Sequence, residues 1–121
     1  MRDDKENIIV DKTFKFALET IDYSEQRRTL HKFEMCSQLF KSATSIGANT
    51  SETQNAESNA DFIHKFKLAA KEAEETNYWL KLCKASAHYP DPPVKMEIEQ
   101  RSIILIISKI ISSSKRRSAL T

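Results

Sequence analysis

The stretch that decides the fold runs from Gln38 to Leu82 and reads QLFKSATSIGANTSETQNAESNADFIHKFKLAAKEAEETNYWLKL. It contains two helical patterns joined by a short turn, where Ser58 is placed to cap the second helix. From that cap onward, core positions recur at alternating spacings of four and three residues, which is typical of a long packed helix. These positions are Phe62, Phe66, Ala69, Ala73, Thr76, Leu80, Cys83 and Ala87.

Outside this stretch, two further segments show a helical pattern. Between residues 8 and 27, apolar side chains at helical spacing predict one buried face, made of Val10, Phe14, Ala17, Leu18 and Ile21. Pro92 stands at the first position of the last segment, where proline favours a helix start. We therefore predict helices over residues 8–27, 30–55, 59–88 and 92–114.

Four helices with short connections predict an all-α protein, an antiparallel up-down-up-down four-helix bundle formed by residues 1–121 as a single domain. The composition agrees, because one glycine and three prolines in 121 residues leave few turn residues for a β-sandwich or barrel. No apolar run reaches the length of about 18 residues that a membrane span needs. The N-terminus has no secretory pattern, so we expect a cytoplasmic protein with Cys36 and Cys83 as buried, unpaired residues.

The last helix contains five consecutive aliphatic residues, Ile103 to Ile107. Such a run points to every side of a helix, so the interior of one bundle does not account for all of it. We expect a subunit interface to cover the excess face, and the N-terminal arm is the alternative cover.

Charge is balanced overall but accumulates toward the C-terminus. Residues 89–121 carry six basic and three acidic side chains, whereas residues 1–37 carry seven and eight, and residues 38–88 carry six of each. Much of the excess is the run Lys115, Arg116 and Arg117, which we expect to fray beyond the final helix. It is either a weak signal for nucleic acid or a solubilising end that complements a helix dipole.

The segments SATSIGAN, SNADFIHK and KEAEETNYWL, with Glu52 after the first of them, resemble the bacterial four-helix bundle proteins called 23S rRNA intervening-sequence proteins. Relatives of that family include the accessory protein of diversity-generating retroelements. Thr50 and Ser51 depart from the family pattern, which leaves the local packing there open. The resemblance implies a homo-oligomer, a pentamer in known members, with RNA, DNA or a nucleic-acid enzyme as candidate partners.

If the chain binds nucleic acid, basic side chains must contact the phosphates. The candidates are Arg27, Arg28, Lys32, Lys41, Arg101, Lys115, Arg116 and Arg117. Solvated surface charge is the alternative interpretation for each of them, because the net charge is only +2.

Polar residues beside the core stripe form the distinctive part of the KEAEETNYWL segment, where Tyr and Trp side chains suit an interface. The predicted oligomer interface consists of Asn49, Glu52, Lys71, Glu72, Glu75, Tyr78, Trp79, Ile104 and Ile106. The alternative is a solvated charged face with Trp79 half-buried inside its own bundle.

We expect no enzymatic activity and no catalytic, cofactor or metal site. Asp61 and His64 share a helical face, but a bundle metal site needs such a pair on two helices together with further carboxylates. No glycine-rich phosphate loop or nucleophile elbow occurs in the sequence. The leading hypothesis is an oligomeric accessory module for nucleic acid or a ribonucleoprotein, and the alternative is a scaffold that contacts protein alone.

Overall fold

The structure is a computed structural model that describes residues 4–28 and 33–120, with side chains described over residues 8–27 and 34–120. Four long helices account for most of the chain, and no strand occurs among the described residues. The predicted all-helical class is therefore confirmed. The helices are α1 (Asp4–Arg28), α2 (Phe33–Glu52), α3 (Asn59–Ala85) and α4 (Val94–Leu120), with a 3₁₀ turn, η1 (Thr53–Asn55), after α2.

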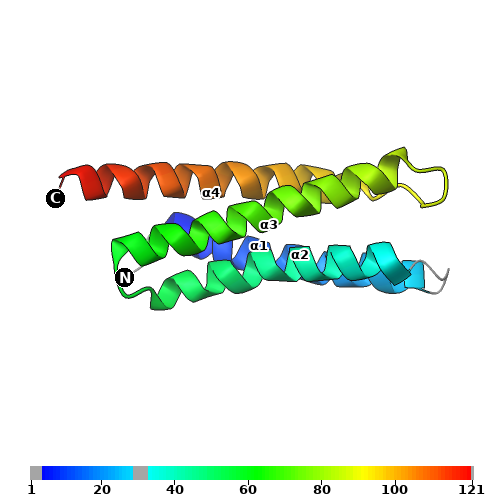
Figure 1. Ribbon diagram of the computed structural model, residues 1–121, viewed down its shortest axis with the longest axis horizontal. Coiled ribbons are helices and arrows are strands. Elements are labelled where there is room, and N and C mark those ends of the chain that lie inside the picture. The colour runs from blue at the N-terminus through cyan, green and yellow to red at the C-terminus, as the bar shows by residue number, and fades with distance from the viewer. Residues whose placement is uncertain (1–3, 29–32, 121) are drawn as a thin grey trace.

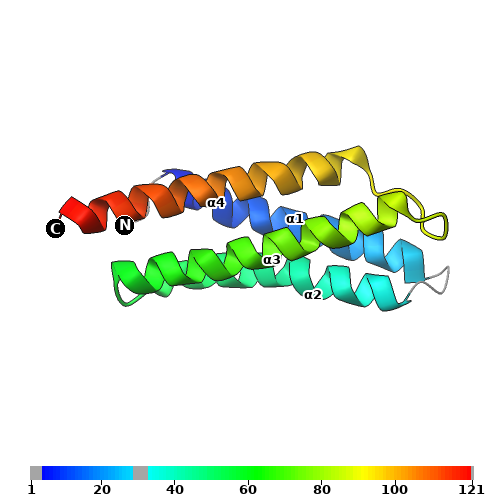
Figure 2. The same ribbon diagram turned by 45° about the horizontal axis from the view of Figure 1, so that its top comes forward.

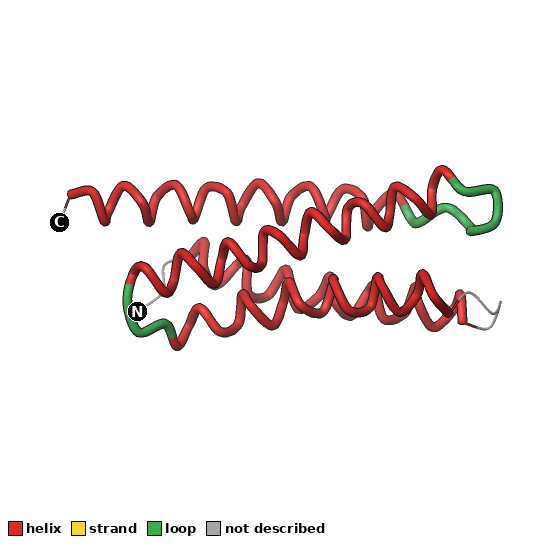
Figure 3. Tube along the Cα trace, in the orientation of Figure 1, coloured by secondary structure: helices red, strands yellow, loops and turns green. Residues whose placement is uncertain are grey.

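The helices pack side by side along one long axis (Figures 1 and 2). Each helix contacts the next one in the chain, and α4 returns to contact α1, so the four enclose a common core. The end that carries the short α2–α3 turn, here called the turn end, also holds the C-terminal end of α4 (Figure 1). The opposite end, here called the loop end, holds the α3–α4 loop, which is green in Figure 3.

The start of α3 is fixed by the cap that the sequence indicates. Ser58 Oγ accepts a hydrogen bond from the backbone N–H of Asp61 at 3.0 Å. Asp61 in turn accepts from the backbone N–H of Glu57 at 3.1 Å. Two backbone donors that the helix itself cannot satisfy are thereby paired, which sets the tight α2–α3 turn.

Both boundaries at the α3–α4 loop differ from the prediction. α3 ends at Ala85 because Ser86 is extended, with φ −77° and ψ 137°, and Ala87 is exposed and lies outside the seam. α4 begins at Val94, after both prolines. The loop is tied back to the bundle, since the Tyr23 hydroxyl donates a hydrogen bond to the carbonyl of Pro90 at 3.1 Å.

The prediction that the basic end of the chain frays was wrong, because α4 continues as a helix to Leu120. Asn59, the first residue of α3, donates hydrogen bonds to the Ser114 carbonyl at 3.0 Å and to the Ser118 hydroxyl. Arg117 also bonds the Ser114 hydroxyl at 3.0 Å. Hydrogen bonds from α3 therefore stabilise the last turns of α4, although the sequence of these turns has no apolar stripe that would predict packing.

The predicted buried face of α1 was also wrong. Among the described side chains of α1, the buried ones are Ile9, Thr13, Phe16, Thr20, Tyr23 and Ser24, whereas Phe14 is 63% and Leu18 is 48% exposed. Threonines can occupy the core face because their hydroxyls bond carbonyls one turn earlier, at 2.8 Å for Thr13 and 2.9 Å for Thr20. The core runs along one side of α1, and a row of apolar residues remains outside.

Candidate interaction surfaces

The predicted interface residues of the KEAEETNYWL segment form a strip along α3 that reaches the flank facing α2, where Glu72 is influenced by the charge of Lys41. Tyr78 is 56% exposed, and Trp79 beside it is partly buried against the core. Their rings meet edge to face with centroids 5.3 Å apart. Lys71 is exposed, and Glu75 is partly buried. An aromatic pair with one ring anchored in the core and one facing solvent is a combination typical of a contact surface.

Glu72 lies within this strip in an unfavourable environment for a charged carboxylate. Burial raises the pKa of Glu72 above its usual 4.5, and the neighbouring Glu75 raises it further. Lys71 and Lys41 act in the opposite direction but do not cancel the shift. The ionised carboxylate is therefore less stable here than in water.

Asn49 and Glu52 lie on the same α2–α3 flank, but nearer the turn end. Glu52 pairs with Lys65 across the two helices at 3.5 Å, and Asn49 donates to the Ser45 carbonyl at 2.9 Å within α2. Fourteen residues separate Lys65 from Trp79, which corresponds to about 21 Å along a helix. The predicted interface residues of α2 and α3 thus line a strip, Ile104 and Ile106 lie apart on α4, and the full set does not form one compact patch.

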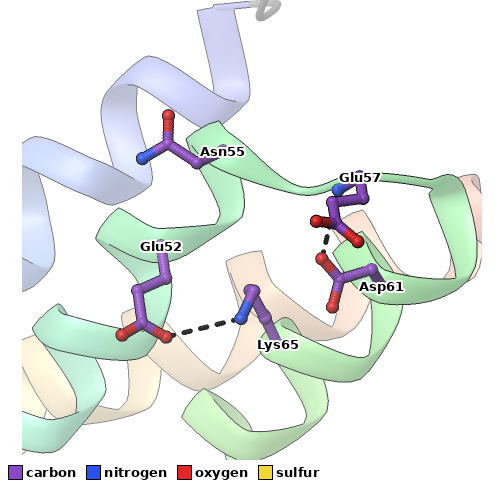
Figure 4. A pocket seen from close by; sticks show the side chains of 5 residues that line it. All are labelled: Glu52, Asn55, Glu57, Asp61 and Lys65. Carbon is purple, nitrogen blue, oxygen red and sulfur yellow. Dashed lines mark hydrogen bonds and ion pairs between the residues drawn. The ribbon is translucent and has the colours of Figure 1, made fainter.

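A solvent-open pocket at the turn end collects three of the acidic residues, as Figure 4 shows. It is lined by Glu52, Asn55, Glu57, Asp61 and Lys65. The carboxylates of Glu52 and Asp61 are used in the ion pair and the helix cap described above. Within the described ranges, no group of three His, Cys, Asp or Glu side chains is placed to hold a metal ion. The polar contacts that line this pocket hold the end of α2 and the start of α3 together.

Most of the Ile103–Ile107 run is covered by its own bundle. Ile103 and Ile107 are fully buried, and Ile104 and Ile106 are partly buried against the core, on the two sides of α4. Only Leu105 projects, with 62% of its surface exposed. Within this run the uncovered apolar surface is narrower than the sequence suggests, because α1 and α3 flank α4 from both sides, and the expected subunit interface on α4 stays a prediction.

The candidate nucleic-acid residues do not form one patch. Arg27 near the loop end stacks its guanidinium over the Tyr23 ring at 3.8 Å. Lys41 and Arg101 are exposed on different helices, and the run from Lys115 to Arg117 is exposed at the turn end. The Arg28 side chain and Lys32 lie outside the described residues.

One signal in α4 went unrecognised in the sequence. From Gln100 to the C-terminus the chain has no Asp or Glu, although it has five basic residues and six serines. Five of those serines and basic residues, namely Ser108, Lys109, Ser112, Ser113 and Arg116, line a shallow depression on the surface of α4 together with Leu105. Counting acids in each predicted helix would have found this segment.

The predicted burial of both cysteines is confirmed. Cys36 donates a hydrogen bond to the Ser24 carbonyl at 3.3 Å, and burial raises the pKa of the Cys83 thiol. Tyr23 lies beside them, and burial together with Cys83 raises its pKa to about 12. The Cys83 thiol therefore holds its proton more tightly than a free thiol does, and a protonated thiol is a weak nucleophile.

These elements define an all-helical protein whose four helices share one core. No helix in the described part of the chain is both long enough and apolar enough to cross a membrane. The chain belongs to the 23S rRNA-intervening sequence protein family, whose model matches residues 5–113. The predicted family is therefore confirmed.

A solved structure supports the same assignment. The crystal structure of a protein with unknown function from the S23 ribosomal protein family of Bacteroides thetaiotaomicron is similar to this chain, with 34% sequence identity and a TM-score of 0.81. The similarity covers 89% of this chain and 98% of that one. No curated protein matches the sequence.

Proposed function

We propose that this protein is a non-enzymatic, homo-oligomeric bundle that binds nucleic acid or a ribonucleoprotein partner in the cytoplasm. In this proposal the helices follow the up-down-up-down order, and the oligomer is the pentamer that the family resemblance implies. The observation that carries the nucleic-acid part is the second half of α4, which has five basic residues and no acid from Gln100 onward. Lysine, arginine and serine are the side chains that most often contact phosphate groups.

The arrangement of α4 favours this role. Lys115, Arg116 and Arg117 are exposed on a helix that is anchored to α3 through Asn59, so their charges are held in fixed positions. An ordered basic helix loses less conformational freedom on binding than a frayed tail does. Each copy in an oligomer would present the same basic end of α4, so the phosphate contacts of all copies would contribute to the affinity for one nucleic acid.

A protein-only scaffold is the second candidate. The exposed aromatic ring of Tyr78 and the small net charge of +2 favour it, because phosphate binders depend on many clustered cations. The two functions differ in their response to salt, since only phosphate binding strengthens steeply as salt falls.

The test is fluorescence anisotropy with labelled generic RNA and duplex DNA over a series of salt concentrations. We expect binding at low salt, with log K falling linearly against log salt. Replacing Lys115, Arg116 and Arg117 together by Gln should weaken binding and reduce that slope, by about 0.7 to 0.9 for each phosphate that the variant no longer neutralises. The matched control removes the same charge from α3, at the exposed Lys67, Lys71 and Lys81.

An absence of binding to both nucleic acids at low salt would reject the nucleic-acid function and favour the scaffold. An equal effect of the two triple variants would mean that binding responds only to net charge, with no role for the end of α4.

A further inference from the structure

A shallow groove runs along the outer surface between α1 and α2, which lie side by side in Figures 1 and 2. Its α1 wall consists of Val10, Phe14 and Ala17. Its α2 wall carries small side chains, at Thr44, Gly47, Ala48 and Ser51. The groove has no charged lining residue.

Large apolar side chains extend both walls. Leu18, one turn after Phe14, is 48% exposed, and Phe40, one turn before Thr44, is 49% exposed. With Phe14 at 63%, three bulky apolar residues stand outside the core on this one face. Such a face is typical of a surface that a partner covers.

The α2 side of this face is depleted of charge. From Met35 to Ser51 the only charged residue is Lys41. Lys41 acts electrostatically on Glu72 of α3, which places it on the opposite flank of α2. Charge depletion is the compositional mark of the central part of a protein interface.

Gly47 supplies an independent observation. A glycine inside a helix lowers stability by about 1 kcal/mol relative to alanine. A Cβ added at Gly47 would meet its nearest neighbour, the Thr13 carbonyl oxygen, at 3.5 Å, which is an ordinary van der Waals contact. The bundle itself therefore does not require glycine at this position, and a partner backbone that approaches the groove closely would require it.

The same chain carries a surface that matches the groove in shape. Val94, Ile98 and Leu105 are 64%, 53% and 62% exposed and lie at helical spacing along the outer side of α4, here called the α4 ridge. The two ends of the ridge are eleven positions apart, or about 16 Å along the helix. Phe40 and Ser51, the ends of the extended α2 wall, are also eleven positions apart.

The exposed charges of α1 and α4 are opposite in sign. Between Ile8 and Arg27, the exposed charged side chains of α1 are Asp11, Asp22 and Glu25 against Lys15, which pairs with Asp11 at 3.0 Å. On α4, the exposed charged side chains are all basic; Lys95 pairs with Glu19 of its own α1 at 3.8 Å, and Lys109 lies beside Leu105.

The acids of α4 are tied inward to its neighbours. Glu97 pairs with Lys84 of α3 at 3.3 Å, and Glu99 pairs with Lys12 of α1 at 2.8 Å. The exposed surface of α1 thus carries net negative charge and that of α4 carries positive charge, and such opposite charges would favour one docking orientation between two copies.

We propose that the α1–α2 groove receives the α4 ridge of a second copy of this chain. This inference rests on the homo-oligomer of the proposed function and names the faces that build it. Each copy would use two different surfaces, so the contact is heterologous and can close into a ring. The basic residues from Lys115 to Arg117 lie beyond the ridge and remain available to another partner.

Two single variants and their mixture test the inference by sedimentation velocity. Phe14→Glu places a charge in the groove, and Leu105→Glu places one on the ridge; both positions are exposed, so each variant should keep the helical circular dichroism of the parent. We expect the wild-type chain to be oligomeric and each variant alone to be monomeric.

An equimolar mixture of the two variants should give a heterodimer and nothing larger, because one intact groove meets one intact ridge. His64→Glu, at an exposed position of α3 outside the predicted interface, is the matched control and should leave the oligomer unchanged.

Three results would overturn the inference. A wild-type chain that is monomeric at every concentration would remove the proposed oligomer as well. An oligomer that survives Phe14→Glu, or one that survives Leu105→Glu, would leave the oligomer in place and reject these faces. A mixture that stays monomeric while both variants are folded would reject the pairing of groove with ridge.

Discussion

The side-chain oxygens of Thr76 on α3 and Ser42 on α2 lie 2.8 Å apart in the core and form a hydrogen bond between the two helices. Both residues are almost fully buried, at 0% and 1% exposure. Thr76 Oγ1 also lies 2.8 Å from the Glu72 carbonyl, one turn earlier. A polar contact in an apolar seam favours one alignment of α2 and α3 along their length, because a shift by one turn would break the hydrogen bond between the two helices.

Thr76→Val keeps the shape of the side chain and removes its hydroxyl. We expect a loss of about 1 to 2 kcal/mol in the free energy of unfolding, because Ser42 then loses its hydrogen bond to α3 in a buried site and keeps only the longer contact of 3.5 Å with the Leu39 carbonyl. Urea denaturation followed by circular dichroism measures the change.

Ser42→Ala and the double variant complete a double-mutant cycle for this pair. The double variant should lose less stability than the sum of the two single losses, by about 0.5 kcal/mol or more. Strict additivity of the two losses would show that the two hydroxyls do not interact.

The sequence predicts α3 well because its seam is apolar and its start has a local cap at Ser58. It does not predict the register of α1, where the core face includes Thr13 and Thr20 and the outer face includes Phe14. Hydrophobic periodicity therefore selects the wrong face of α1 as the buried one. It counts threonine as polar even where the hydroxyl is bonded to a backbone carbonyl of the same helix and the side chain is buried. The length of α4 depends on Asn59, a residue far away in the chain, so no local pattern encodes it.

A comparison of Phe16 with Phe14 tests the register of α1. Phe16 is 1% exposed and Phe14 is 63% exposed, although they lie two residues apart. On the dissociated chain, Phe16→Ala should lower the free energy of unfolding by about 3 to 5 kcal/mol, because it leaves a cavity in the core. Phe14→Ala should change it by about 0.5 kcal/mol or less. If Phe14→Ala lowered the free energy of unfolding more than Phe16→Ala did, the buried face of α1 would be the one that the sequence predicts.

The raised pKa of Glu72 predicts a pH-dependent effect. The folded state holds the proton of Glu72 more tightly than the unfolded state does, so ionisation lowers stability as pH rises above the usual value of 4.5. Glu72→Gln removes that ionisation and should raise the melting temperature at neutral pH. Below pH 4.5 the difference from wild type should disappear.

Thermal melts of wild type and Glu72→Gln at neutral and acidic pH make the measurement. Glu74→Gln, at an exposed position on the same helix, is the control for the loss of one negative charge. A stabilisation of Glu72→Gln that persists unchanged in acid would mean that ionisation is not its cause.

Gly47→Ala should separate the stability of the single chain from its assembly. Alanine favours the helix by up to about 1 kcal/mol, and the added Cβ meets the Thr13 carbonyl oxygen at an acceptable 3.5 Å. The dissociated chain should therefore melt at a higher temperature than wild type. The same methyl group fills part of the α1–α2 groove, so the oligomer should dissociate at a higher protein concentration. Calorimetry on the dilute chain measures the melting temperature, and sedimentation over a concentration series measures the dissociation of the oligomer. If Gly47→Ala stabilised both the chain and the oligomer, the groove would not need glycine for the close approach of a second copy.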